Sequence, residues 1–179
     1  MKRMDKRLLF ITQAAVIAAL YVALTYAQNF LLPGTTSMAV QFRASEALTL
    51  LACFTPAAIP GLTVGCLIFN VSNVQALPLD WAMGTAATLL ATLAMWALRK
   101  LRVKKLPLVS ALMPAVFNGI IVGIELQLYF PVEGKGPLLG AVINGGLVAL
   151  GELGVCFTLG LLLCAAMEQA NIRRHLKTQ

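Results

Sequence analysis

Long apolar stretches with almost no charge constrain this chain more than any other feature of its sequence. Of its 179 residues, 59% are hydrophobic and only 12% are charged, whereas a soluble domain has about 25% charged residues. A soluble protein needs charged side chains to cover its surface, so lipid must be the solvent of this chain. The apolar residues form runs rather than an alternating pattern, which indicates membrane-spanning helices and not a transmembrane β-barrel.

The length of the chain limits how many helices it can form. A helix needs about 20 apolar residues to cross a bilayer, so the chain has room for about six spans with short loops. The sequence predicts helices over residues 8–27, 43–54, 59–72, 79–98, 108–130 and 138–167. The first run is too long for a signal-peptide core, and Pro114 should kink the fifth helix. We expect one all-α membrane domain over residues 1–179.

The basic residues predict how these helices are oriented. Three segments hold 12 of the 14 Lys and Arg residues, namely Lys2, Arg3, Lys6 and Arg7, then Arg99, Lys100, Arg102, Lys104 and Lys105, then Arg173, Arg174 and Lys177. With six helices, the three segments fall on one side of the membrane, and cytoplasmic loops carry an excess of Lys and Arg. Both termini are therefore expected in the cytoplasm, and the net charge of +7 is a topology signal rather than a nucleic-acid-binding surface.

Polar residues of the helices gather in the half that is expected to face the exterior. They are Gln41, Arg43, Glu46, Asn70, Asp80, Asn118, Glu125, Asn144 and Glu152. Ionisable groups in hydrocarbon are costly and normally face a cavity or a partner, so the asymmetry predicts a polar pocket open to the exterior. One basic and four acidic groups suit a cation, or a heterocycle with several N–H donors, better than an anion.

Packing alternatives remain open for several of these residues. Arg43 and Glu46 are three positions apart on one helix and can pair with each other. Asp80 can be the N-cap of the fourth helix, and the asparagines can join helices rather than contact a ligand. Glu125 and Glu152 have no basic residue within their own helices, which favours a position facing a ligand.

Small residues on the first helix predict a close contact with another helix. Alanines recur every four positions, with two more beside them: Ala15, Ala19, Ala23 and Ala27, then Ala14 and Ala18. This spacing lets a second membrane helix approach the backbone, and we expect a partner subunit there. Gly61 and Gly65, like Gly119 and Gly123, have the same spacing, and for them we expect packing within the chain.

Catalytic groups are missing from the sequence. The single histidine, His175, lies in the carboxy-terminal tail, so there is no histidine metal site and no Ser-His-Asp triad. The four cysteines lie in apolar stretches without metal-ligand spacing and are predicted to pack. Residues 133–136 contain a Gly-Lys pair but not the rest of a P-loop. We expect no enzyme activity, no cofactor and no metal, and we expect partners or an ion gradient to drive uphill uptake.

Five stretches of the sequence resemble the QueT family: residues 40–49, 58–62, 65–70, 118–126 and 151–153. The similarity covers essentially the whole chain and is most specific in residues 40–49 and 118–126. QueT proteins are substrate-binding S-components of energy-coupling factor (ECF) transporters. The resemblance implies a six-helix S-component bundle in a bacterial cell membrane, with the solute bound near the outer face under the first loop.

The resemblance also implies partner subunits. In ECF transporters, a scaffold membrane subunit and two cytoplasmic ATPases supply the energy, and the S-component topples in the membrane to carry its solute inward. The contact of the first helix with the scaffold subunit would fall on Ala15 and Ala19, or on Ala14 and Ala18, with Ala23 continuing the stripe.

The family is associated with queuosine precursors, which are deazaguanine bases such as queuine and its aminomethyl precursor. A guanine-type edge presents two adjacent N–H donors, and these would face Glu125 or Glu152. The aminomethyl cation would face Glu46 or Asp80.

Phe42 or Trp81 would stack on the ring of such a ligand. Two other readings remain open, an S-component for another vitamin-like heterocycle and a stand-alone secondary transporter. The second would be favoured by inverted repeats, and the sequence has no convincing internal repeat. A membrane enzyme is the least favoured reading, because nucleophile–base arrangements are absent.

Overall fold

The computed structural model describes residues 5–35, 42–103 and 106–170, and within them the chain is helical with no β-strand. The helices are α1 (Lys6–Leu31), the 3₁₀-helix η1 (Ala44–Cys53), α2 (Ala58–Ser72), α3 (Asp80–Leu98), α4 (Leu108–Ala111), α5 (Met113–Tyr129), α6 (Pro137–Val155), the π-helical turn η2 (Cys156–Gly160) and α7 (Leu161–Gln169). Helix therefore occupies each of the six predicted ranges, and the single-domain organisation stays a prediction.

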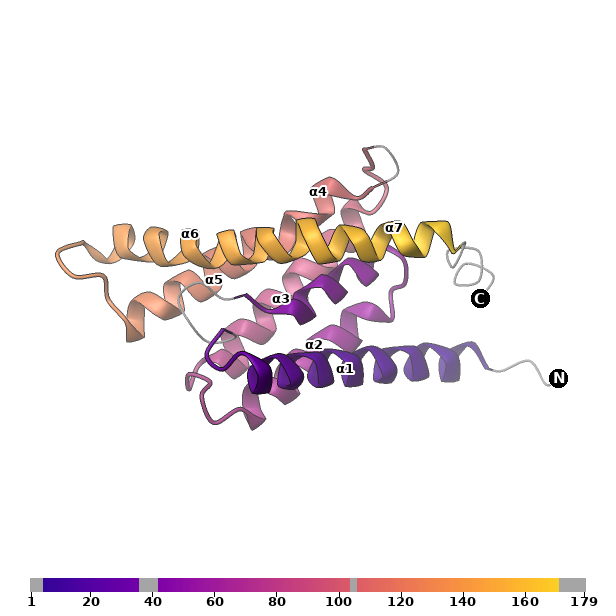
Figure 1. The fold of residues 1–179 in the computed structure, drawn as a ribbon, viewed down its shortest axis with the longest axis horizontal. Coiled ribbons are helices and arrows are strands. Elements are labelled where there is room, and N and C mark those ends of the chain that lie inside the picture. The colour runs from indigo at the N-terminus through magenta and orange to yellow at the C-terminus, as the bar shows by residue number, and fades with distance from the viewer. Residues whose placement is uncertain (1–4, 36–41, 104–105, 171–179) are drawn as a thin grey trace.

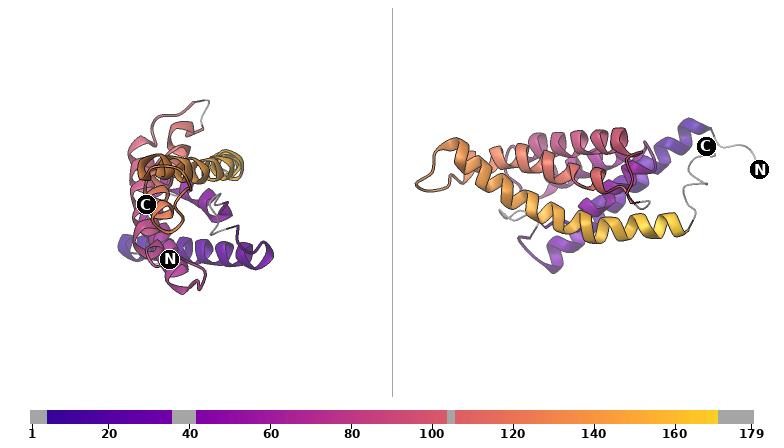
Figure 2. Two further views of the ribbon diagram at one scale, coloured as in Figure 1. Left: turned by 90° about the vertical axis from the view of Figure 1, so that its left-hand side faces the viewer. Right: turned by 90° about the horizontal axis from the view of Figure 1, so that it is seen from above.

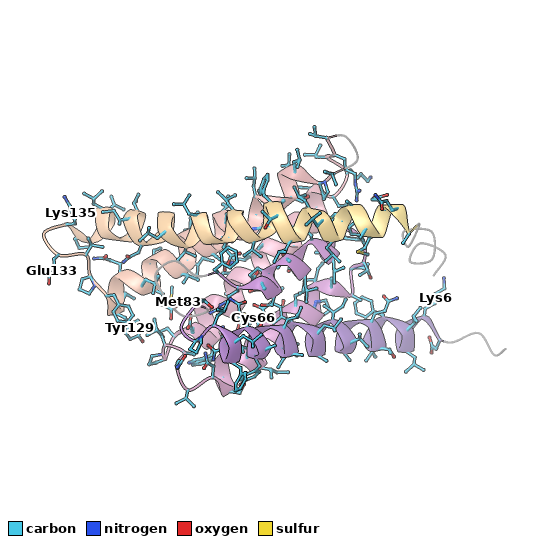
Figure 3. All side chains as sticks on the ribbon, in the orientation of Figure 1. Lys6, Cys66, Met83, Tyr129, Glu133 and Lys135 are labelled. Carbon is cyan, nitrogen blue, oxygen red and sulfur yellow. The ribbon has the colours of Figure 1, made fainter. Side chains whose placement is uncertain are left out.

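Four helical segments are long and apolar enough to cross a membrane: Lys6–Leu31, Asp80–Leu98, Leu108–Tyr129 and Pro137–Gln169. The segments η1 and α2 are apolar but shorter. Helix α1 begins and α7 ends at the same end of the molecule (Figure 1), and the loop with Glu133 and Lys135 lies at the other end (Figure 3). The all-helical class is thus confirmed for the described residues, whereas six crossings and cytoplasmic termini stay predictions.

The 3₁₀-helix η1 is the central element of the bundle. Helix α1 and the rod formed by α6, η2 and α7 lie on opposite sides of it (Figures 1 and 2). It packs against α1, α2, α3, α6, η2 and α7. A 3₁₀-helix of ten residues is unusual, since runs of more than about four residues are uncommon. At a rise of about 2.0 Å per residue, η1 extends over about 20 Å, a third longer than an α-helix of the same length.

At two places the structure departs from a regular α-helix in a way that the sequence analysis did not predict. At Pro114 the expected kink is an interruption, because α4 ends at Ala111 and α5 begins at Met113 with the proline in its first turn. Proline has no N–H and clashes with the preceding turn, so a helix restarts there more readily than it continues. The π-helical turn η2 was not predicted, and Cys156 at its start lies 3.9 Å from the carbonyl oxygen of Glu46 in η1.

Glycines on α2 bring that helix against α1. A Cβ added at Gly61 would lie 2.6 Å from the carbonyl oxygen of Ala14, and one added at Gly65 would lie 3.0 Å from that of Ala18. Ala14 and Ala18 are therefore used for packing within the chain. The alanines that remain on the exposed side of α1 are Ala15, Ala19, Ala23 and Ala27. The surface left for a partner is narrower than the predicted one.

A second close contact joins α5 and α6. A Cβ added at Gly123 would lie 2.5 Å from the Cα of Gly145, and one added at Gly145 would collide with the carbonyl oxygen of Gly119. The glycine pair of α5 thus packs within the chain, as expected from its spacing. This contact fixes the relative position of two helices that each carry a buried glutamate, Glu125 on α5 and Glu152 on α6.

Adjacent glycines of α6 allow a matched test of this contact. Gly145→Ala should destabilise the protein by about 1–3 kcal/mol, because the added methyl group overpacks the helix crossing. Gly146→Ala should be neutral or stabilise by up to about 1 kcal/mol, since a Cβ there meets no atom within 4 Å. The measurement is the unfolding temperature of each purified variant in detergent. Equal temperatures for the two variants would contradict the close crossing of α5 and α6.

Candidate functional site

Four carboxylic acids are buried inside the bundle, and each comes from a different helix. Glu46 lies on η1, Asp80 on α3, Glu125 on α5 and Glu152 on α6. None is more than 3% exposed. Among the described residues, Arg43 is the one buried basic side chain, and it directly precedes η1. We call these five residues the acid cluster.

The members of the acid cluster interact with one another. Arg43 interacts electrostatically with Glu46 and Asp80, and also with Glu125 and Glu152. Two acid–acid interactions complete the cluster, one between Glu46 and Glu152 and one between Asp80 and Glu125. Because one guanidinium is shared among four acids, the protein supplies less positive charge than the cluster can accept.

Three side chains of α1 hold the beginning of η1. They share one face of α1, at positions i, i+4 and i+7. The first, Tyr21, donates its hydroxyl to Glu46 at 2.5 Å, and the second, Thr25, donates its hydroxyl to Ser45 at 2.7 Å. The third, Gln28, accepts the Ala44 N–H at 2.6 Å and donates its amide to the Phe42 carbonyl oxygen. Sequence reasoning missed these residues, although polar side chains on one face of an apolar helix were a signal for them.

Two asparagines join α5 and α6 at different levels. Asn118 donates to Glu152 at 3.1 Å and so belongs next to the acid cluster. Asn144 donates to the side chain of Gln127 and to the carbonyl oxygen of Phe130, both at 3.3 Å. The amide nitrogens of both residues thus serve as interhelical links, the alternative that the sequence had left open. Asn144 contacts the end of α5 rather than an acid.

Asp80 is held by the turn before α3 and is not the N-cap of that helix. The N-cap is Leu79 and makes no side-chain capping bond, whereas Asp80 is the first helical residue. One carboxylate oxygen of Asp80 accepts the backbone N–H of Leu77 at 3.2 Å. The carbonyl oxygen of Asp80 accepts the amide of Asn70 at 2.9 Å, which ties α2 to α3.

Several acceptor atoms of this region have no hydrogen-bond donor among the residues that the structure describes. They are both carboxylate oxygens of Glu125, one oxygen each of Glu46 and Glu152, and the amide oxygen of Asn70. Roughly 90% or more of buried polar groups have a partner, and an unsatisfied one costs about 1–3 kcal/mol. A concentration of unsatisfied acceptors is therefore a place where a ligand with N–H donors would be stabilised.

The other predicted site residues lie around this cluster in different ways. Phe42 is half-exposed, and its ring contacts α6 at Gly154, where an added Cβ would lie 3.3 Å away. Trp81 follows Asp80 at the start of α3 and is 52% exposed. Gln41 lies outside the described residues. No group of three or more His, Cys, Asp or Glu residues that could hold a metal is present in the described part of the chain.

An apolar groove of about 570 Å³ also lies along α5 and α6. Its walls include Val116, Ile120 and Val142, whose side chains are exposed on the outside of the bundle. It contains none of the buried acids. Because apolar walls cannot select a polar solute, we place the candidate site at the acid cluster and not in this groove.

Two tyrosines of α1 allow a test of how Glu46 is held. Tyr21→Phe should destabilise the protein by about 1–3 kcal/mol, because it leaves a buried carboxylate without its donor. Tyr26→Phe removes a hydroxyl that bonds Ser72 near the surface, where water can replace it, so its effect should be smaller. Unfolding temperatures of both variants in detergent provide the comparison. A larger loss for Tyr26→Phe would contradict the assigned role of Tyr21.

Comparison with known proteins gives one family match. The model of one family, described as QueT transporter, matches residues 11–169. The match begins within α1 and ends at the last residue of α7, so all four buried acids lie inside it. The chain matches no curated protein and no solved structure.

Proposed function

The chain belongs to the QueT transporter family, and we propose that it is the substrate-capturing S-component of an ECF-type importer in a bacterial cell membrane. Membership makes it a membrane transporter of a small molecule. In our proposal the solute is a queuosine precursor, a deazaguanine base such as queuine or its aminomethyl precursor. The chain captures it near the outer face and carries it inward by toppling against its partner subunits.

The acid cluster is the observation that supports this substrate class. The unsatisfied atoms of its acids are carboxylate oxygens of Glu46, Glu125 and Glu152, so the site suits a ligand rich in donors. A guanine-type edge presents adjacent N–H groups, and a carboxylate accepts such a pair in bidentate fashion. An anionic solute would instead be repelled by four acids that share one arginine.

The proposed topology has six membrane crossings with both termini in the cytoplasm. Two observations support it. Helix α1 begins and α7 ends at the same end of the molecule (Figure 1), and basic residues flank both helices there. The 3₁₀ geometry of η1 supports it as well, because a rise of about 2.0 Å per residue lets a short segment extend further through the bilayer.

The proposed partners are a scaffold membrane subunit and two cytoplasmic ATPases. The chain has no complete P-loop, so in this proposal the ATPases drive uptake. The exposed alanines Ala15, Ala19 and Ala23 are the proposed contact with the scaffold subunit, since small side chains let a second helix approach closely. Copurification of ATPase subunits would favour this reading over a stand-alone secondary transporter.

A binding titration tests the substrate. The purified chain should bind queuine or its aminomethyl precursor with a Kd in the nanomolar range, and guanine much more weakly, because scarce solutes require tight capture. Intrinsic fluorescence reports binding, because one tryptophan, Trp81, neighbours Asp80 at the start of α3. The other, Trp96, lies near the other end of α3, where the guanidinium of Arg99 is 3.6 Å from its ring centroid. The signal should be lost in Trp81→Phe and kept in Trp96→Phe. No binding of either deazaguanine would refute the assigned substrate.

Neutral replacements of the acids separate a binding role from a structural one. Glu125→Gln and Glu152→Gln should weaken binding by about 2 kcal/mol or more. Glu125→Gln should also raise the unfolding temperature of the ligand-free protein, because a neutral amide costs less to bury than a carboxylate that has no donor on either oxygen. Glu133→Gln, in the exposed loop, is the control and should change neither quantity. Unchanged affinity in variants of all four acids would exclude the cluster as the binding site.

A further inference from the structure

Asp80 and Glu125 of the acid cluster form a distinct group with the neighbouring Asn70. All three are at least nine-tenths buried. The carboxyl groups of Asp80 and Glu125 interact with each other, although the residues described supply no donor to either oxygen of Glu125. Asn70 is tied to Asp80 by the 2.9 Å bond from its amide to the Asp80 carbonyl oxygen. Asp80 on α3 thus links Asn70 of α2 with Glu125 of α5.

The orientation of the Asn70 side chain follows from its partner. A backbone carbonyl oxygen can only accept a hydrogen bond, so the atom of Asn70 that contacts Asp80 must be the amide nitrogen. The amide oxygen therefore points elsewhere, and it is buried without a donor in the described part of the chain. Gly84 allows this approach, because a Cβ there would lie 2.9 Å from the Asn70 nitrogen and 3.7 Å from a carboxylate oxygen of Asp80.

The acids of the cluster differ in the donors that the protein gives them. Glu46 receives the Tyr21 hydroxyl, Glu152 the Asn118 amide and Asp80 the Leu77 N–H, whereas neither oxygen of Glu125 has a donor among the residues described. Arg43 interacts with both groups of acids and carries a single charge. Glu125, which interacts with Asp80, is therefore the acid with the greatest unmet demand for donors.

We infer that Asp80, Glu125 and the amide oxygen of Asn70 form a subsite for a protonated primary amine of the transported ligand. An alkylammonium group has three N–H donors and no acceptor, which gives one donor to each carboxylate and one to the amide oxygen. Glu46 and Glu152 then accept the neutral N–H groups of the ring. The inference rests on the proposed function and deepens it, because it assigns the two ends of the ligand to different acids.

Two ligands that differ only in the amine test the assignment. The wild-type chain should bind the aminomethyl deazaguanine at least about thirtyfold more tightly than its methyl analogue, since thirtyfold corresponds to about 2 kcal/mol. Asp80→Asn and Glu125→Gln should reduce this preference to about threefold or less, while the affinity for the methyl analogue changes little. Glu152→Gln is the matched control: it should weaken both ligands in parallel and keep the preference. Loss of the preference in Glu152→Gln, but not in Glu125→Gln, would overturn the inference.

A second measurement is independent of the deazaguanine. Methylammonium should raise the unfolding temperature of the ligand-free wild type, whereas tetramethylammonium, which has no N–H donor, should not. The increase should disappear in Asp80→Asn and Glu125→Gln and persist in Glu152→Gln. An equal increase with sodium, or one that persists in all three variants, would overturn the amine subsite. If neither deazaguanine binds the wild type, the proposed substrate fails, and the methylammonium result alone decides the subsite.

Discussion

The burial of four carboxylic acids with one arginine is the constraint on which the rest of this structure depends. Moving a charged group out of water is expensive unless the protein provides partners. The chain provides the Tyr21 hydroxyl for Glu46, the Asn118 amide for Glu152 and Arg43 for the whole cluster. It stops short of satisfying every oxygen. A bundle optimised only for stability would fill these positions with apolar residues, so the cost is evidence of a task for which acceptors are required.

The 3₁₀-helix η1 carries one of the four acids and packs against most of the other helices. A 3₁₀-helix eclipses its side chains at every third residue and is not stable by itself over ten residues, so its neighbours must hold it. They do so on several sides: α1 bonds residues 42–46, and the π-helical turn η2 contacts it at Cys156. The π-helical turn, a kind of segment that is frequent at functional sites, therefore lies beside Glu46 of η1 and directly follows α6, the helix of Glu152.

Much of the fold could be predicted from the sequence, because apolar length and proline positions are local signals. The helices occupy the predicted ranges, and the acids that the sequence singled out are all buried. What could not be predicted depends on rotation and pairing. Whether Ala14 or Ala15 faces α2 depends on how α1 is turned about its axis, and the bond from Tyr21 to Glu46 joins residues 25 positions apart. Which oxygens remain unsatisfied emerges only when every partner is placed.

Helix α1 combines three contacts that are usually spread over different elements. One side packs on the glycines of α2, a second bonds the start of η1 through Tyr21, Thr25 and Gln28, and a third carries the exposed alanines. Within the proposed importer, the helix that meets the scaffold subunit is then the one that positions Glu46 and the residues preceding it. A partner that displaces α1 would act first on these hydrogen bonds, because buried bonds depend on distances of a few tenths of an ångström. In the proposed importer, the contact with the partner and the support of Glu46 would thus depend on the same helix.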